Sequence, residues 1–225
     1  MKPKRAMIAG ATGLIGNELL QILLREQQYE HVCALVRQPL ALTHPKLQVV
    51  VCDFDRLEAF KGHLAVDDVF CCLGTTINKA KTREAMYRVD VEYPVALARL
   101  AREQGAAHFL VVSAADADVK SFFWYRRLKG TLEAEITGLP YPAISIFRPS
   151  LLLGPRKEFR LFENLAVKSI SLLSGLLHRP LSSQAAIAAT VVAQAMYRVA
   201  QAQETGVHIY SPRQIAAIEQ GTAVI

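Results

Sequence analysis

The stretch Gly10-Ala-Thr-Gly13-Leu-Ile-Gly16 decides how the rest of this 225-residue sequence is interpreted. It lies between a short apolar run, Ala6–Ala9, and a segment with leucine and isoleucine at helical spacing, Leu14–Gln28. In a dinucleotide-binding turn the first glycine permits the sharp exit from the strand, the second lets the backbone approach a pyrophosphate, and the third lets the helix pack closely on the strand. The unpaired N–H groups at the helix N-terminus then hold the phosphates. The stretch therefore predicts a dinucleotide site.

Short apolar runs alternate with longer segments of helical periodicity along the first 150 residues. The runs are compact rather than strictly alternating, which is typical of strands buried on both faces. Strands separated by helices imply right-handed crossovers, so we predict an α/β, doubly wound parallel-sheet Rossmann fold. The predicted strands are Ala6–Ala9, His31–Val36, Leu47–Val51, Asp68–Leu73, Phe109–Ser113 and Ala143–Phe147. The predicted helices are Leu14–Gln28, a short one at Arg56–Phe60, Met86–Glu103 and Phe122–Thr137.

The last third of the chain changes character after the turn-rich stretch Leu151–Pro155. No linker rich in glycine, serine or proline precedes it, so we expect one compact domain: an NADP-binding core over residues 1–150 and a small C-terminal lid or substrate lobe over residues 151–225. We predict helices over Phe159–Leu177, Ala185–Ala202 and Pro212–Gln220 and a short strand at Val207–Tyr210. Phe159–Leu177 is either a lid or a surface-binding helix, and its place beyond the carboxyl edge of the sheet, where ligands bind, favours the lid.

Composition excludes several classes of protein. Hydrophobic residues make up 52% of the chain, which excludes a disordered protein. The longest apolar stretches are shorter than the roughly 20 residues that a bilayer span needs, and the start of the chain lacks the pattern of a signal peptide. We therefore expect no transmembrane segment and a cytoplasmic location. The four cysteines lie in or beside apolar runs without a C-x-x-C pair, so no metal site is expected.

The net charge of +6 is spread along the chain. Short basic clusters occur at Lys79–Arg83, Arg126–Lys129 and Arg156–Arg160, but there is no basic arm with interleaved aromatic residues. Nucleic-acid-binding proteins usually concentrate their charge on one stripe. We expect a solvated surface, with a phosphorylated small molecule as the second interpretation, and no nucleic-acid partner.

The end of the second predicted strand indicates which coenzyme the turn would bind. Proteins that bind NAD usually place Asp or Glu there for the ribose hydroxyls, whereas this chain has Arg37. A guanidinium pairs with a 2′-phosphate that a carboxylate would repel, so NADP(H) is favoured over NAD(H). After the third strand, Asp53 and Phe54 are candidates for contact with the adenine. After the fourth, Leu73-Gly74-Thr75 puts a small residue where the backbone passes close to the coenzyme.

Tyr125 and Lys129 form the second chemical signal. Residues four apart share one face of a helix, so the ammonium lies one turn from the phenol. A free tyrosine is a poor base at neutral pH, and the nearby positive charge favours its phenolate. The phenol can then give a proton to a carbonyl oxygen as hydride arrives, or take one from an alcohol. The alternative is a surface tyrosine beside a solvated lysine.

Several further motifs occur in a fixed order: Cys71-Cys-Leu-Gly-Thr-Thr76, Tyr87-Arg-Val-Asp90, Val112-Ser-Ala-Ala-Asp-Ala-Asp118, Tyr125-x-x-x-Lys129-Gly130 and Phe147-Arg-Pro149. Together with the glycine turn they resemble the atypical branch of the short-chain dehydrogenase/reductase superfamily, and within it the mammalian Tat-interacting oxidoreductase homologues. The resemblance runs to about residue 155. It implies a Rossmann fold, a bound coenzyme and, in this superfamily, often a homodimer; some members are regulators with protein partners.

The resemblance also implies roles for individual residues. Arg37 would bind the 2′-phosphate, Tyr125 would be the acid/base, and Lys129 would be its partner and orient the ribose. The phosphates would lie against Gly10, Thr12, Gly13, Leu14, Ile15 and Gly16. Leu73, Gly74 and Thr75 would follow the ribose, and Arg148 and Pro149 would pass near the nicotinamide.

The chain departs from the superfamily after the fifth strand, where the catalytic serine is expected. Relatives have Ser-Ser there, and this chain has Ser113-Ala114. If the working hydroxyl belongs to the first position, Ser113 supplies it; if it belongs to the second, it is missing. Ser113 is therefore either a third catalytic residue or a structural hydroxyl at the strand end.

The sequence thus predicts an NADP(H)-binding oxidoreductase that transfers hydride to or from a small or medium apolar carbonyl or alcohol. Phe122, Phe123 and Trp124, next to Tyr125, are either core residues or one wall of an apolar substrate pocket. The alternative function is an NADP(H)-sensing regulatory or scaffold protein with little turnover, which the alanine at position 114 would suit.

Overall fold

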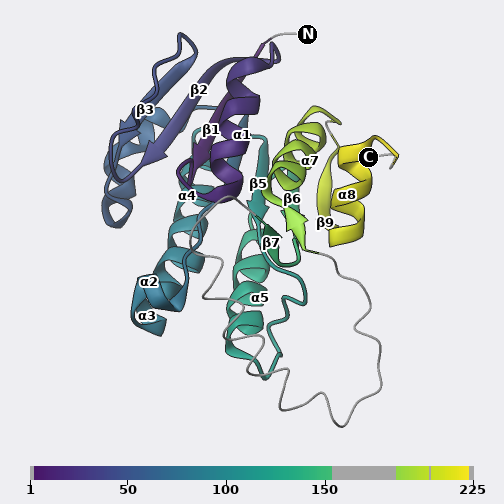
Figure 1. The fold of residues 1–225 in the computed structure, drawn as a ribbon. Coiled ribbons are helices and arrows are strands. Elements are labelled where there is room, and N and C mark those ends of the chain that lie inside the picture. Colours follow the sequence, from purple (N-terminus) through teal and green to yellow (C-terminus); the bar gives the residue numbers. More distant parts are fainter. Residues whose placement is uncertain (1–2, 154–185, 203, 223–225) are drawn as a thin grey trace.

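The computed structural model describes residues 3–153, 186–202 and 204–222. A seven-stranded sheet runs through these parts in the order β3-β2-β1-β4-β5-β6-β9, and every neighbouring pair in it is parallel (Figure 1). The strands are β1 Lys4–Ala9, β2 Tyr29–Val36, β3 Leu47–Val51, β4 Asp68–Cys71, β5 His108–Val112, β6 Ala143–Phe147 and β9 Gly206–Tyr210. The short β7 Leu152–Leu153 and β8 Ile187–Ala188 pair with each other.

Helices cover both faces of the sheet. One apolar layer lies under α1, α7 and α8, and the other under η1, α4 and α5 (Figure 1). The helices are α1 Leu14–Arg25, the 3₁₀ helix η1 Phe54–His63, α2 Ile77–Ala80, α3 Arg83–Tyr87, the π-helical η2 Arg88–Glu92, α4 Tyr93–Glu103, α5 Trp124–Thr137, α7 Ala189–Ala202 and α8 Pro212–Gln220. The doubly wound Rossmann fold predicted from the sequence is confirmed.

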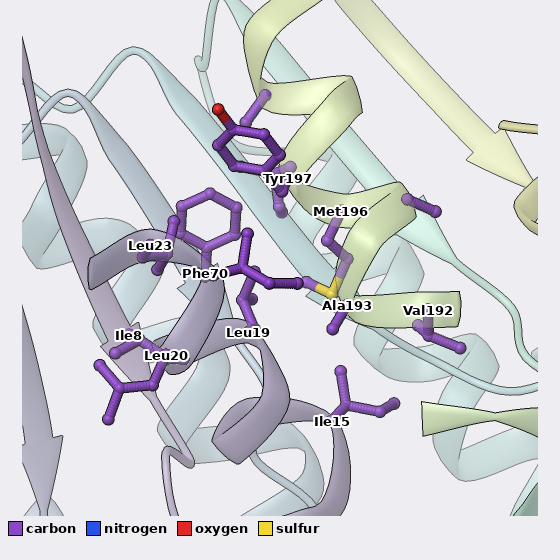
Figure 2. Close-up of a cluster of buried hydrophobic side chains, with 14 of the residues drawn as sticks. Ile8, Ile15, Leu19, Leu20, Leu23, Phe70, Val192, Ala193, Met196 and Tyr197 are labelled. Carbon is purple, nitrogen blue, oxygen red and sulfur yellow. The ribbon is translucent and has the colours of Figure 1, made fainter. Parts of the chain in front are cut away.

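The core between α1 and α7 explains why the first crossover is firmly held. Leu19 and Leu23 of α1 pack with Met196 of α7 over Ile8 and Phe70 of the sheet, and all five side chains are inaccessible to solvent (Figure 2). Burying each large apolar side chain contributes about 1.5–3 kcal/mol. The glycine turn at the start of α1 therefore sits on a rigid base.

The six predicted strands are all present, with small shifts at their ends. β2 begins two residues earlier than predicted, at Tyr29; β4 ends at Cys71 and β5 at Val112. The first helix ends at Arg25 because Glu26 is extended and leads into β2. The helix predicted over Ala185–Ala202 begins at Ala189, after β8.

The single helix predicted over Met86–Glu103 is wrong in one respect: η2 interrupts it with a π-helical turn. Pro94 has no N–H to donate to the carbonyl four residues before it, and the N–H of Tyr93 reaches back five residues to the carbonyl of Arg88. The chain therefore carries one extra residue in this turn, and Asp90 lies within it.

The C-terminal part of the chain joins the main sheet. β9 pairs with β6, and α7 lies beside α1 (Figure 1). The predicted lid helix Phe159–Leu177 falls outside the described residues, so the division at residue 150 stays a prediction. Within the described ranges, no helix is long and apolar enough to cross a membrane, and no cluster of histidine, cysteine or acidic residues could hold a metal ion.

Candidate coenzyme and acid/base site

The glycine turn adopts the conformation that a dinucleotide site requires. Gly10 has a φ of +86°, and a Cβ there would collide with the carbonyl oxygen of Cys72 at the end of β4. A Cβ on Gly16 would collide with the carbonyl oxygen of Gly10. The N–H of Gly13 donates to that same carbonyl at 2.9 Å and closes the turn. Only backbone fits at this crossing of β1, β4 and α1.

The N-terminus of α1 has features that suit an anion. Its first turn contains Leu14 and Ile15, no acidic residue, and no side chain among the described residues caps it. Thr12 is exposed beside it. The first N–H groups of a helix, which have no partner within it, and the positive end of the helix dipole suit a pyrophosphate. These residues fit the phosphates of a dinucleotide.

The residues predicted to hold the adenosine end lie beyond β2 and β3. Arg37 is exposed and directly follows the last residue of β2. An open pocket of about 400 Å³ lies nearby, lined by side chains that include Thr12, Asn17 and Leu40. Arg37 is not among the residues that line this pocket, so its pairing with a 2′-phosphate stays a prediction.

Asp53 and Phe54 are engaged in local structure. The carboxylate of Asp53 accepts a hydrogen bond from the N–H of Asp55 at 3.0 Å and caps η1. The ring of Phe54 is buried in the core and lies 5.5 Å from the ring of Tyr93, centroid to centroid. Little of the Phe54 ring is left to line an adenine, whereas Asp53 is exposed.

Tyr125 and Lys129 occupy one face of α5 but differ greatly in exposure. Tyr125 is 45% exposed, whereas Lys129 is buried, and its Nζ lies 2.7 Å from Oδ1 of Asp90 in η2. Burial disfavours the ammonium, but the charges of Asp90 and Tyr125 outweigh it and raise the pKa of Lys129. The lysine is therefore held as a cation one helical turn from an exposed tyrosine.

Asp90 also fixes the loop that follows β4. Its Oδ2 accepts a hydrogen bond from the N–H of Thr75 at 2.9 Å. Leu73 and Thr75 are half-buried and Gly74 is exposed. The loop predicted to follow the ribose is thus linked, through the carboxylate of Asp90, to the lysine of the predicted acid/base pair.

Ser113 and Arg148 meet at a second buried carboxylate, Glu133 of α5. The hydroxyl of Ser113 donates to Oε1 of Glu133 at 2.6 Å, and the guanidinium of Arg148 donates to both of its oxygens. The hydrogen bonds to Glu133 raise the pKa of Arg148. Pro149 is buried, and its carbonyl accepts from the N–H of Ala115 at 3.0 Å. The ends of β5 and β6 are thereby joined to α5.

The structure thus brings the glycine turn, the loop after β4 and the pair Tyr125–Lys129 to one edge of the sheet. Sequence reasoning missed Asp90 and Glu133. Asp90 stood in a motif to which no role was assigned, and Glu133 follows Lys129 by four residues, a spacing that could have placed it on the same helix face. Phe122 and Phe123 are not core residues: they are 93% and 63% exposed at the start of α5.

A family model described as NAD(P)H-binding matches residues 10–136, which span the glycine turn and Lys129. The chain belongs to this NAD(P)H-binding family. It is 38% identical over 175 residues to the protein HTATIP2 of Rattus norvegicus, covering 75% of this chain and 71% of that protein. It is 32% identical over 152 residues to the mitochondrial protein FMP52 of Eremothecium gossypii, covering 68% of each.

Two solved structures of other proteins have the same fold. MoeE5 in complex with UDP-glucose and NAD has a TM-score of 0.68 at 16% identity, over 92% of this chain and 75% of that one. UDP-N-acetylglucosamine 4-epimerase from Methanobrevibacter ruminantium M1 has a TM-score of 0.69 at 16% identity, over 94% and 77%. The resemblance to atypical short-chain dehydrogenases/reductases is confirmed.

Proposed function

We propose that the protein is an NADP(H)-dependent oxidoreductase that moves hydride between the coenzyme and a small or medium apolar carbonyl or alcohol. The observation that carries the proposal is the accessible phenol of Tyr125 one helical turn from the buried cation of Lys129. General acid–base catalysis needs a proton donor that substrate can reach and a fixed charge that favours its deprotonated form. The exposure of Tyr125 and the buried ammonium of Lys129 one helical turn away support the proposal.

The roles of the chain's own residues follow from their positions. The amides at the start of α1 would bind the pyrophosphate, and Arg37 would pair with the 2′-phosphate. When bound, the nicotinamide supplies or accepts hydride at C4. In reduction, the hydroxyl of Tyr125 gives its proton to the carbonyl oxygen; in oxidation, the phenolate takes the proton of the alcohol. Lys129 would stabilise the phenolate. Asp90 contacts both Lys129 and the N–H of Thr75, and so holds the lysine in place relative to the loop after β4.

The test is oxidation of NADPH against a panel of apolar aldehydes and ketones. Replacing Tyr125 by phenylalanine should lower kcat/KM by about 10²–10⁴-fold, the usual contribution of a general acid, and leave the Kd of NADPH within threefold. Tyr87, an exposed tyrosine of α3, is the matched control, and Tyr87→Phe should behave as wild type. Equal rates for Tyr125→Phe and wild type would remove Tyr125 from the mechanism.

A second function is an NADP(H)-sensing regulatory or scaffold protein. It is favoured by Ala114, which has no hydroxyl, and by the neighbouring Ser113, whose hydroxyl is donated to Glu133. This function predicts tight NADPH binding, no turnover across the panel and partner capture that differs between NADP, NADPH and no coenzyme. Identical captured proteins in all three conditions would count against it.

A further inference from the structure

The face of α5 that carries Tyr125 and Lys129 continues to a third polar residue. Glu133 lies four residues beyond Lys129, so the phenol, the ammonium and the carboxylate are stacked one turn apart along the helix. Glu133 is 6% exposed. The proposed reaction uses the first two of these side chains and assigns nothing to the third.

Both carboxylate oxygens of Glu133 accept hydrogen bonds from residues that follow two strands. Ser113, directly after β5, donates its hydroxyl proton to Oε1 at 2.6 Å. Arg148, directly after β6, donates through Nε to Oε1 at 2.9 Å and through Nη2 to Oε2. Bidentate pairing of arginine with carboxylate fixes both distance and orientation. One carboxylate therefore sets the spacing between β5, β6 and the helix that bears Tyr125.

The same contacts decide what Ser113 can do. A serine hydroxyl has one proton to donate, and here that proton is bound to a buried carboxylate. Ser113 is 5% exposed, and its N–H is also engaged, by the carbonyl of Phe147 at 2.7 Å. Turning the hydroxyl towards a substrate would break this hydrogen bond to a buried carboxylate and leave Nε of Arg148 as the remaining donor to Oε1, which is costly because hydrogen bonds to charged groups are among the stronger ones.

We infer that Glu133 is a positioning residue for the reaction proposed above, on which this inference rests: it holds the ends of β5 and β6 against α5 and accepts the hydrogen bond of the Ser113 hydroxyl, so that Ser113 supports the site and does not polarise the substrate carbonyl. The proton transfer then falls to Tyr125. The sequence left the role of Ser113 open, and this arrangement assigns it.

The first arm of the test is a double-mutant cycle on thermal stability with Ser113→Ala, Glu133→Ala and the double variant. Ser113→Ala should lower the Tm by a few degrees in the wild-type background and by less than half as much beside Glu133→Ala, because residues in one hydrogen-bond network are not additive. Ser145, a buried serine of β6 that pairs with His108 at 2.8 Å, is the matched control. Ser145→Ala should be additive with Glu133→Ala.

If Glu133→Ala does not fold, Glu133→Gln takes its place in both cycles, and the coupling between Ser113 and Glu133 need only be non-zero. Additive shifts for Ser113 and Glu133 would overturn the inference.

The second arm measures kcat per NADPH-binding site, so that loss of folded protein does not enter. Glu133→Gln should lower kcat at least tenfold while the Kd of NADPH changes less than threefold, because a misplacement of about 1 Å costs about 10²-fold. Ser113→Ala should lose two- to tenfold. A loss of 10² or more in Ser113→Ala, which is the usual cost of removing an oxyanion donor, would overturn the inference, as would a wild-type kcat in Glu133→Gln.

The two arms separate this inference from the function on which it rests. The melting cycle needs no turnover. A protein that binds NADPH and reduces nothing refutes the oxidoreductase, while the cycle still decides whether Ser113 is committed to Glu133. Turnover that depends on Tyr125, together with additive melting shifts, would refute the role of Glu133 and leave the oxidoreductase standing.

Discussion

The Nζ atom of Lys129 lies 2.7 Å from Oδ1 of Asp90, and their side chains are 4% and 1% exposed. The pair links α5 to the π-helical turn η2, and the second oxygen of Asp90 links both to the loop after β4. Two charges buried in contact stabilise each other, but either one alone is expensive to bury.

Replacing Asp90 by asparagine should lower the free energy of unfolding by about 3 kcal/mol, because the buried ammonium of Lys129 loses its counter-charge. Urea unfolding measures the change. The exposed pair of Arg99 and Glu135, 3.7 Å apart, is the control, and Glu135→Gln should change the free energy by less than about 0.5 kcal/mol. Equal effects of the two substitutions would show that the Asp90–Lys129 pair is not buried in solution.

Stability should fall as the pH drops from about 6.5 towards 4, because burial lowers the pKa of His108 to about 4. In the unfolded chain His108 has the ordinary histidine pKa near 6.5 and binds a proton in this range, whereas in the folded chain it stays neutral. The contribution of the neutral His108 to the free energy of unfolding is fully present above pH 6.5. It is lost progressively as the pH falls towards 4, by about 3 kcal/mol in all. His108→Gln should flatten this slope in urea unfolding, while His63→Gln, at an exposed position, should not. An unchanged slope in His108→Gln would contradict the prediction.

NADPH should raise the Tm more than NADH at equal concentration. A ligand at about a hundred times its Kd adds roughly 2.7 kcal/mol, and Arg37 offers a partner only to the 2′-phosphate. Arg37→Ala should weaken NADPH at least tenfold and leave NADH within threefold. Arg99→Ala, an exposed arginine of α4, is the control. A larger shift with NADH than with NADPH would refute the assignment of Arg37.

Replacing Gly16 by alanine should abolish coenzyme binding and lower stability by 2 kcal/mol or more, on the order of other severe packing clashes, because its Cβ would collide with the carbonyl oxygen of Gly10. Gly62 is the matched control, since a Cβ there would meet nothing within 4 Å. Circular dichroism and coenzyme titration of both variants check the prediction. A Gly16→Ala protein that binds NADPH like Gly62→Ala would mean that the turn has room to spare.

The sequence predicted the sheet and the glycine turn because both depend on local patterns. Buried parallel strands are compact apolar runs, and the turn needs glycine at fixed spacing. It did not predict the partners of Lys129 and Ser113, since Asp90 and Glu133 reach them only after separate elements have packed together. It also left open whether Phe122 and Phe123 are core residues, because an apolar cluster in the sequence does not show what packs against it.

The π-helical turn η2 has a consequence for which changes of length this chain tolerates. Successive residues of a helix point about 100° apart. Deleting one residue between Arg88 and Glu92 would therefore restore ordinary helical winding and turn the carboxylate of Asp90 away from Lys129 of α5. Substitutions on the solvent side of the turn should leave its winding intact. Deletion of a single residue should instead break the link between α5 and the loop after β4, without changing any residue proposed to bind the coenzyme. The extra residue thus sets the direction in which the carboxylate of Asp90 points. The number of residues in the turn matters for this, rather than the identity of any one side chain.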